Sequence, residues 1–225
     1  MFDCVGESVY ILFLYGSFSW AQVLYIIVVG GPCTGKTTIV QGVARQLESK
    51  GFKVKIIDDQ ARLIIREQQR RGGDILPWID RLRFEEEVVR RHYLEYLKAL
   101  REKPDVVIDD SGVFTALAYI EVDGLKPSKK IMDIVEKLRG KVDLVLLTKP
   151  PSKYHTDSER WEDVEYAKRI HEAIRKVHLE LFPGKVVLVD SYHNVEDRIR
   201  EATEKILSMI TDEISKGVYA SSITR

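Results

Sequence analysis

Two patterns of hydrophobic and polar positions alternate along most of this chain. Apolar, largely β-branched runs recur at Tyr25–Val29, Phe52–Ile57, Val106–Asp110, Val142–Leu147 and Val186–Val189. The first and last carry no charge, the second alternates in part with Lys53 and Lys55, the third ends in two acids, and the fourth contains Asp143. Such runs are typical of strands that are buried on both faces of a parallel sheet. Between them, apolar residues return every three or four positions, which is the spacing of amphipathic helices. The alternation predicts an α/β fold with one doubly wound parallel sheet of five strands flanked by helices.

The helical spacing also locates the predicted helices. The first follows a glycine-rich stretch and is closed by Gly51, and a later one is expected to open at Pro77 because proline favours the first turn of a helix. The expected ranges are about 39–50, 61–71, 77–100, 114–122, 131–138, 162–181 and 195–214.

The amino end differs from the rest of the chain, because residues 8–35 carry no charge. A membrane span is not expected, since no Lys or Arg precedes Lys36 and the uncharged run outside the first strand is short and contains Ser17, Ser19 and Gln22. Val9–Tyr15 fits an extra strand better. We therefore divide the chain into an amino-terminal extension of open role, residues 1–22, and a single domain, residues 23–225.

The stretch between the first predicted strand and helix is Gly30-Gly31-Pro32-Cys33-Thr34-Gly35-Lys36-Thr37-Thr38. It fits the phosphate-binding motif G-x-x-x-x-G-K-[ST] without a mismatch. A predicted strand precedes it and a predicted helix follows it, as the motif requires. In this motif the backbone N–H groups and the helix N-terminus surround a phosphate chain. Lys36 is predicted to reach the β- and γ-phosphates, and the Thr37 hydroxyl to hold Mg²⁺. The motif predicts binding of a nucleoside triphosphate.

Acidic residues follow the second and third strands, at the sheet edge where ligands bind in this fold. Asp109 and Asp110 end a hydrophobic strand, which is where P-loop proteins place the acid that holds Mg²⁺. Neighbouring strand residues point in opposite directions, so only one of the two is expected to meet the metal, and the sequence leaves open which. Asp59 has two interpretations. It can take the proton of an acceptor hydroxyl, or it can cap the helix that starts at Ala61.

A polar segment, Tyr154–Arg160, lies where small kinases of this fold place a lid. Arg160 is predicted to close over the phosphates and to offset charge in the transition state. The alternative is an exposed, solvated loop.

Composition narrows the class of partner. Lys+Arg and Asp+Glu both number 35, so no excess of basic charge indicates a nucleic-acid partner. Two cysteines do not form a disulfide framework, and a cytoplasmic setting fits best. The single asparagine, Asn194, is typical of thermophilic proteins, in which labile residues are scarce. His171 and His178 lack further ligands at metal-binding spacing, so zinc is not expected.

Three stretches carry a family resemblance: the phosphate loop, Asp59-Gln60-Ala61-Arg62, and Asp157-x-x-Arg160 before a helix. Together they resemble the AAA-type ATPase domain that NadR-type nicotinamide riboside kinases share with a fly trafficking protein that binds GTP. The resemblance covers about residues 25–207. It implies that Arg198, near the entry of the last helix, lies close to the nucleotide base. Ser111 and Thr115 stand where that family commonly has an arginine and a second acid, so the acceptor stays open.

The residues and the resemblance together predict an Mg²⁺-dependent P-loop kinase that uses ATP to phosphorylate a small molecule such as a nucleoside. Lys36, Asp59 and Arg160 are the expected catalytic residues. A nucleotide-dependent switch with a protein or lipid partner is the alternative. No N-K-x-D tetrad for guanine is present, which favours ATP but leaves GTP possible. The oligomeric state is open.

Overall fold

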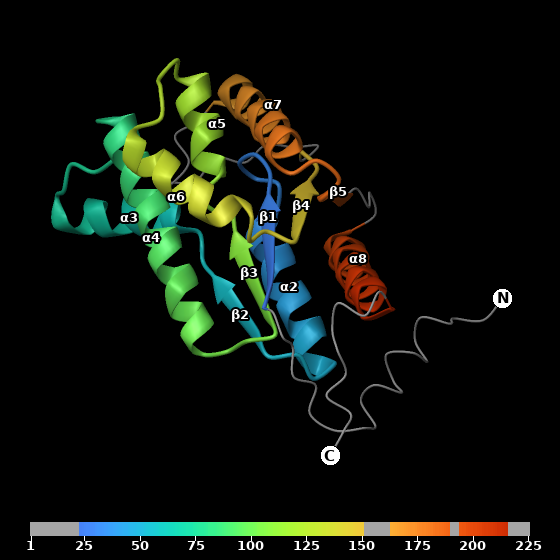
Figure 1. Cartoon of the computed structure of the whole chain (residues 1–225). Coiled ribbons are helices and arrows are strands. Elements are labelled where there is room, and N and C mark those ends of the chain that lie inside the picture. Colours follow the sequence, from blue (N-terminus) through green and yellow to red (C-terminus); the bar gives the residue numbers. More distant parts are fainter. Residues whose placement is uncertain (1–22, 151–162, 190–193, 216–225) are drawn as a thin grey trace.

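A five-stranded parallel sheet forms the centre of the computed structural model, which describes residues 23–150, 163–189 and 194–215 (Figure 1). The strand order is β2-β3-β1-β4-β5. The bounds are β1 (Leu24–Val29), β2 (Val54–Ile57), β3 (Val106–Asp110), β4 (Leu144–Thr148) and β5 (Val186–Val189). All neighbouring strands are parallel, so the predicted fold class is confirmed.

The burial of the central strand β1 explains why its sequence is an uncharged run. All six of its residues are buried, because the sheet is covered on both faces. Residues Tyr25, Ile27 and Val29 face one hydrophobic core, and the alternate residues Leu24, Ile26 and Val28 face the other.

Helices cover both faces of the sheet (Figure 1). α2 and α8 supply the core beneath Leu24, Ile26 and Val28, while α4, α5, α6 and α7 supply the opposite core. α3 packs mainly against α4 through a smaller cluster. The bounds are α2 (Lys36–Ser49), α3 (Gln60–Arg71), α4 (Arg81–Arg101), α5 (Thr115–Val122), α6 (Lys129–Arg139), α7 (Val164–Leu181) and α8 (Val195–Ser215).

The start of α4 corrects one prediction. The helix begins at Arg81, not at Pro77, because the Asp80 side chain accepts a hydrogen bond from the Arg83 N–H and caps the first turn. Residues just before it form a tight turn in which the Ile79 N–H bonds the Leu76 carbonyl oxygen. Pro77 lies in a turn, and the N-cap residue three positions later, Asp80, determines where the helix begins.

The register of β1 and β3 determines where the functional groups meet. Val28 pairs with Asp110 across the two strands, so the loop that follows β1 leaves the sheet beside the end of β3. Within the described residues, no helix combines the length and apolarity needed to cross a bilayer. The extra strand predicted at Val9–Tyr15 falls outside the described residues.

Candidate active site

The phosphate loop connects β1 to α2 at the carboxyl edge of the sheet. Gly35 precedes the helix with φ 81°, a left-handed conformation that glycine adopts without strain, and no side chain caps the first turn. The first N–H groups of α2 therefore have no side-chain partner in the helix itself and point toward the loop. A helix start of this kind is suited to binding a phosphate.

Thr148, the last residue of β4, supports the loop from one side. Its Oγ1 lies 2.7 Å from the Thr34 hydroxyl oxygen and 3.0 Å from the Val29 carbonyl oxygen. A Cβ atom on Gly30 would lie only 2.1 Å from that Oγ1. The first glycine of the motif is thus needed for close packing against Thr148.

His171 on α7 supports the loop from the other side. Its Nδ1 accepts the Gly31 N–H at 3.1 Å, and a Cβ atom on Gly31 would lie 2.9 Å from the His171 Cβ. Burial lowers the pKa of His171; the charge of Glu172 acts in the opposite direction, and those of Lys36 and Arg175 lower the pKa further. A lowered pKa favours the neutral ring, which is the form that can accept a hydrogen bond. Sequence reasoning considered this histidine only as a metal ligand, since no short motif links it to Gly31.

Lys36 and Thr37 occupy the positions expected of the motif. The Lys36 ammonium donates to the Gly31 carbonyl oxygen at 3.1 Å, which keeps it over the loop. The Thr37 hydroxyl donates to Asp110 Oδ2 at 2.6 Å. The side chains therefore bring the loop and the end of β3 into direct contact.

Asp110 is the acid that lies beside Thr37. Its Oδ1 is buried and has no hydrogen-bond partner among the residues that the structure describes. Burial, followed by the charge of Asp59, raises the pKa of Asp110 to about 6. A buried carboxylate oxygen without a partner beside a hydroxyl group fits a hard cation, because Mg²⁺ prefers oxygen ligands. Thr37 and Asp110 would be its protein ligands.

Asp109 points to the other side of β3 and is occupied there. Its Oδ2 accepts the Tyr25 hydroxyl at 2.7 Å, and its Oδ1 lies 2.9 Å from Nδ1 of the buried His92. Burial lowers the pKa of His92, but the Asp109 charge and hydrogen bond outweigh it and the net pKa is raised. Of the two candidate acids, only Asp110 is beside Thr37, and Asp109 instead joins the strand to α4.

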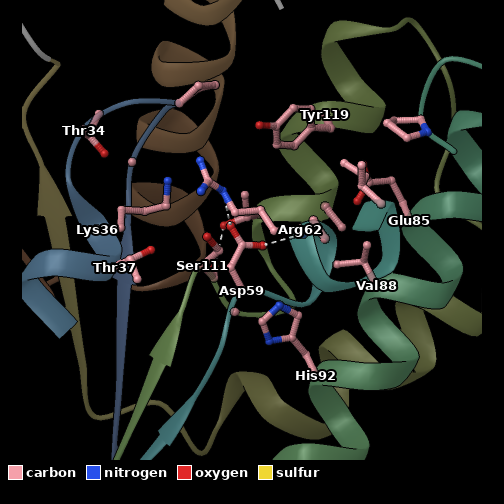
Figure 2. Close-up of a pocket in the computed structure, with 18 of the residues that line it drawn as sticks. Thr34, Lys36, Thr37, Asp59, Arg62, Glu85, Val88, His92, Ser111 and Tyr119 are labelled. Atoms are coloured by element: carbon pink, nitrogen blue, oxygen red, sulfur yellow. Dashed lines mark hydrogen bonds and ion pairs between the residues drawn. The ribbon is translucent and has the colours of Figure 1, made fainter. Parts of the chain in front are cut away.

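Asp59 lies between the phosphate loop and the rest of the cavity (Figure 2). It is the N-cap of α3, because its Oδ1 accepts the Arg62 N–H at 3.3 Å, and its Oδ2 lies 3.8 Å from Arg62 Nε. The two interpretations of Asp59 are therefore compatible. The cap fixes the carboxylate, and the same carboxylate lines the cavity with Lys36 and Thr37.

The cavity has a volume of about 280 Å³ and extends well beyond the loop. Figure 2 shows Lys36 and Thr37 at one end, Asp59 in the middle, and Glu85 and Val88 at the other end. Beyond the loop and Asp59, the lining combines aromatic, aliphatic and charged side chains: Ala61, Arg62, Ile65, Pro77, Arg81, Phe84, Glu85, Val88, His92, Ala116 and Tyr119. Sequence reasoning did not find Arg81 and Glu85, because they lie within an ordinary amphipathic helix pattern.

Arg198, one of the predicted site residues that the structure describes, does not line this cavity. Arg198, on α8, donates from Nη1 to the Thr34 carbonyl oxygen at 3.3 Å, so it contacts the back of the phosphate loop. Arg160, the predicted lid residue, lies outside the described residues. The turn after β3 places Ser111 at φ 85°, an unusual conformation for serine, with its side chain facing the cavity.

A phosphate loop between a buried strand and a helix, with an acid of the neighbouring strand at its threonine, defines a P-loop nucleotide-binding protein. The model of a family described as "AAA domain" matches residues 25–198, which is most of the chain. The protein belongs to this family. It is an enzyme of the ATP-dependent kinase and triphosphatase class.

Comparisons with individual proteins agree with this assignment. A "Probable thymidylate kinase" of Archaeoglobus fulgidus is 26% identical over 203 residues, covering 83% of this chain and 97% of that protein. A crystal structure described as NadR protein in complex with NR matches with a TM-score of 0.58 and 17% identity. A second NadR structure, with NAD and AMP-PNP, matches with a TM-score of 0.57 and 18% identity. Both matches cover 90% of this chain but only about half of the NadR chains (52% and 51%), and they establish a shared fold.

Proposed function

We propose that this protein is an Mg²⁺-dependent kinase that transfers the γ-phosphate of ATP to a hydroxyl group of a small molecule such as a nucleoside. The observation that carries the proposal is the arrangement of one cavity, in which a phosphate loop, a central acid and an aromatic far end follow one another. A hydrolase needs room only for water beside the γ-phosphate. The room beyond Asp59 suits an organic acceptor instead.

Each group in the cavity has a part in this proposal. Lys36 and the loop amides would hold the phosphates, and Thr37 and Asp110 would hold Mg²⁺, which would offset negative charge on the phosphates. Asp59 orients the acceptor hydroxyl and accepts its proton as the phosphoryl group is transferred. Arg160 closes the site from the lid segment. Phosphoryl transfer depends mainly on positioning and charge stabilisation, so these groups suffice.

The relatives support the proposal. One is described as a probable thymidylate kinase, and one NadR structure contains AMP-PNP, a triphosphate analogue. These descriptions suggest ATP as the donor and a nucleoside or nucleotide as the acceptor. Ser111 and Thr115, which differ from the resembling family, both line the cavity, and the identity of the acceptor is left to experiment.

The test is ADP release from Mg-ATP with a panel of acceptors that includes thymidine, thymidylate and nicotinamide riboside. The variant Asp59→Asn removes the proton acceptor while keeping the size of the side chain, and we expect release to fall about a hundredfold. Asp58→Asn is the matched control, because the neighbouring Asp58 is exposed and lies outside the cavity. Slow ADP release that no acceptor stimulates, and that Asp59→Asn leaves unchanged, would contradict the kinase and favour a nucleotide-dependent switch.

A further inference from the structure

The far end of the cavity receives whatever part of the acceptor is not being phosphorylated. With the reacting hydroxyl at Asp59, the rest of the acceptor extends toward Glu85 and Tyr119, away from Lys36 (Figure 2). The groups at that end therefore decide which acceptors fit. This inference rests on the proposed kinase function and deepens it.

Glu85 is an unusual side chain for such a place. It is 3% exposed, and burial raises its pKa to about 7 even though the charge of Arg81 acts in the opposite direction. A buried ion pair is weak evidence for a stabilising role, because desolvation of both charges offsets their attraction. Stability alone therefore does not explain why a charged pair lies at this position.

Arg81 fixes the Glu85 carboxylate in position. Its Nη1 donates to Glu85 Oε1 at 3.0 Å, and its Nε donates to Asp123 Oδ2 at 2.8 Å. Its Nη2 lies 3.3 Å from the Tyr166 hydroxyl, and its guanidinium carbon lies 5.1 Å from the centre of the Tyr119 ring. A guanidinium held by this many groups acts as a clamp, so Glu85 keeps one orientation without help from a ligand.

The cavity around Glu85 is lined by apolar side chains and by hydrogen-bond donors. Phe84, Val88 and Ala116 are apolar, while Arg62, Arg81, His92 and Tyr119 carry donor groups. A ring carbonyl oxygen placed against the ionised Glu85 carboxylate would meet no donor in that side chain, which is costly in a desolvated site. An –NH₂ group at the tip of the ring would instead donate to the carboxylate.

We propose that Glu85 is a specificity-determining residue that selects acceptors whose ring end carries an exocyclic amino or carboxamide –NH₂ group. The ring lies in the part of the cavity that Phe84, Ala116 and Tyr119 line, and the –NH₂ group donates to Glu85. Above about pH 7, where Glu85 is ionised, nucleosides with a carbonyl or carboxylate at the same place are rejected, because an oxygen there faces the carboxylate oxygens of Glu85.

The test measures kcat/KM for three matched pairs: cytidine and uridine, adenosine and inosine, and nicotinamide riboside and nicotinic acid riboside. The second member of each pair replaces the –NH₂ group by an oxygen. In the wild type we expect the amino or amide member of the accepted pair to be preferred at least about tenfold, since a site that hydrogen-bonds a substrate N–H rejects analogues without it.

Glu85→Gln provides the decisive variant. The glutamine carbonyl oxygen keeps the bond to Arg81, which leaves its –NH₂ group facing the cavity as a donor. The preference should then disappear or reverse. Glu86→Gln is the control on the same helix, because Glu86 pairs with Lys130 at 3.1 Å outside the cavity and its removal should leave the preference unchanged.

The outcomes separate the two proposals. A loss of activity in Glu85→Gln that is equal for both members of a pair indicates a structural role and overturns the inference, as does a wild type that uses only thymidine, thymidylate or a carbonyl member. In those cases the kinase itself stands. ADP release stimulated by no acceptor overturns the kinase, and the role of Glu85 with it.

Discussion

The phosphate loop and the far end of the cavity are held in place by different kinds of contact. The loop depends on its own backbone and on neutral neighbours: Thr148 packs against Gly30, and His171 accepts the Gly31 N–H. The far end depends instead on charge, with Glu85 held by Arg81. We expect the loop to bind the phosphate chain of the donor in every reaction. We expect the far end to select among different acceptors.

This difference teaches where specificity can change. Gly30 and Gly31 have almost no space for a side chain, so we expect a larger residue at either position to abolish binding of the phosphates. At the far end, the Arg81–Glu85 pair can be altered without touching a backbone group. Variants at the two ends should therefore differ in kind: loss for every acceptor at the loop, and a changed ratio between acceptors at Glu85.

The largest effect is expected for Lys36→Ala. Removing the ammonium group takes a fixed positive charge from the transferred phosphoryl group, and we expect ADP release to fall about a thousandfold with every acceptor alike. Thermal unfolding measured with and without Mg-ATP checks the cause. The variant should melt like the wild type alone and lose the rise in Tm that nucleotide gives.

Lys50→Ala is the control for that variant, since Lys50 is an exposed residue at the other end of α2. It should keep both activity and the nucleotide-dependent rise in Tm. Tight, unchanged Mg-ATP binding by Lys36→Ala would contradict the assignment of the loop.

The same contrast explains what could be predicted from the sequence. The strand pattern, the phosphate loop and the acids at strand ends are local signals, because each lies within a few consecutive residues and has a fixed meaning. The partners that complete the site are distant in the chain. His171 meets Gly31 only because α7 packs over the loop, and Arg81 and Glu85 face the cavity only because α4 packs beside α3. No local pattern marks these contacts.

Unfolding measured at a series of pH values, without Mg²⁺ or nucleotide, is expected to detect one buried carboxyl group at each end of the cavity. Burial raises the pKa of Glu85 from 4.5 to about 7 and that of Asp110 from 3.8 to about 6. A raised carboxyl pKa gives stability that is fully present below the unfolded value and is lost as pH rises through the folded value. Each group should therefore lower the free energy of unfolding by about 3 kcal/mol between pH 4 and pH 7.5.

Two variants divide this loss between the ends. Urea unfolding of Glu85→Gln should lack the part that falls through about pH 7, and that of Asp110→Asn the part that falls through about pH 6. Adding Mg²⁺ and nucleotide should remove the Asp110 part alone, because the cation would offset only that charge. If the free energy of unfolding varied with pH in the same way in the wild type and both variants, burial would not raise the pKa of either carboxyl group.

The smallest effect is expected for Thr148→Val, which keeps the size of the side chain and removes its hydroxyl. The Thr34 hydroxyl and the Val29 carbonyl oxygen each lose a neighbour at hydrogen-bond distance, which should cost about 1 kcal/mol of the free energy of unfolding. Because the same contacts position the loop, KM for ATP should rise about fivefold while kcat changes little.

Thr203→Val separates positioning from stability. Thr203 is buried like Thr148, but its hydroxyl donates to the Ile199 carbonyl oxygen within α8, at 2.8 Å and away from the loop. It should lose a similar free energy of unfolding and keep the wild-type KM for ATP. Thr148→Ser, which restores the hydroxyl, should return KM toward the wild type even if the lost methyl group keeps its stability low. If both valine variants raised KM for ATP equally, the position of the loop would depend on the overall stability of the protein. The claim that local contacts fix the loop would then be wrong.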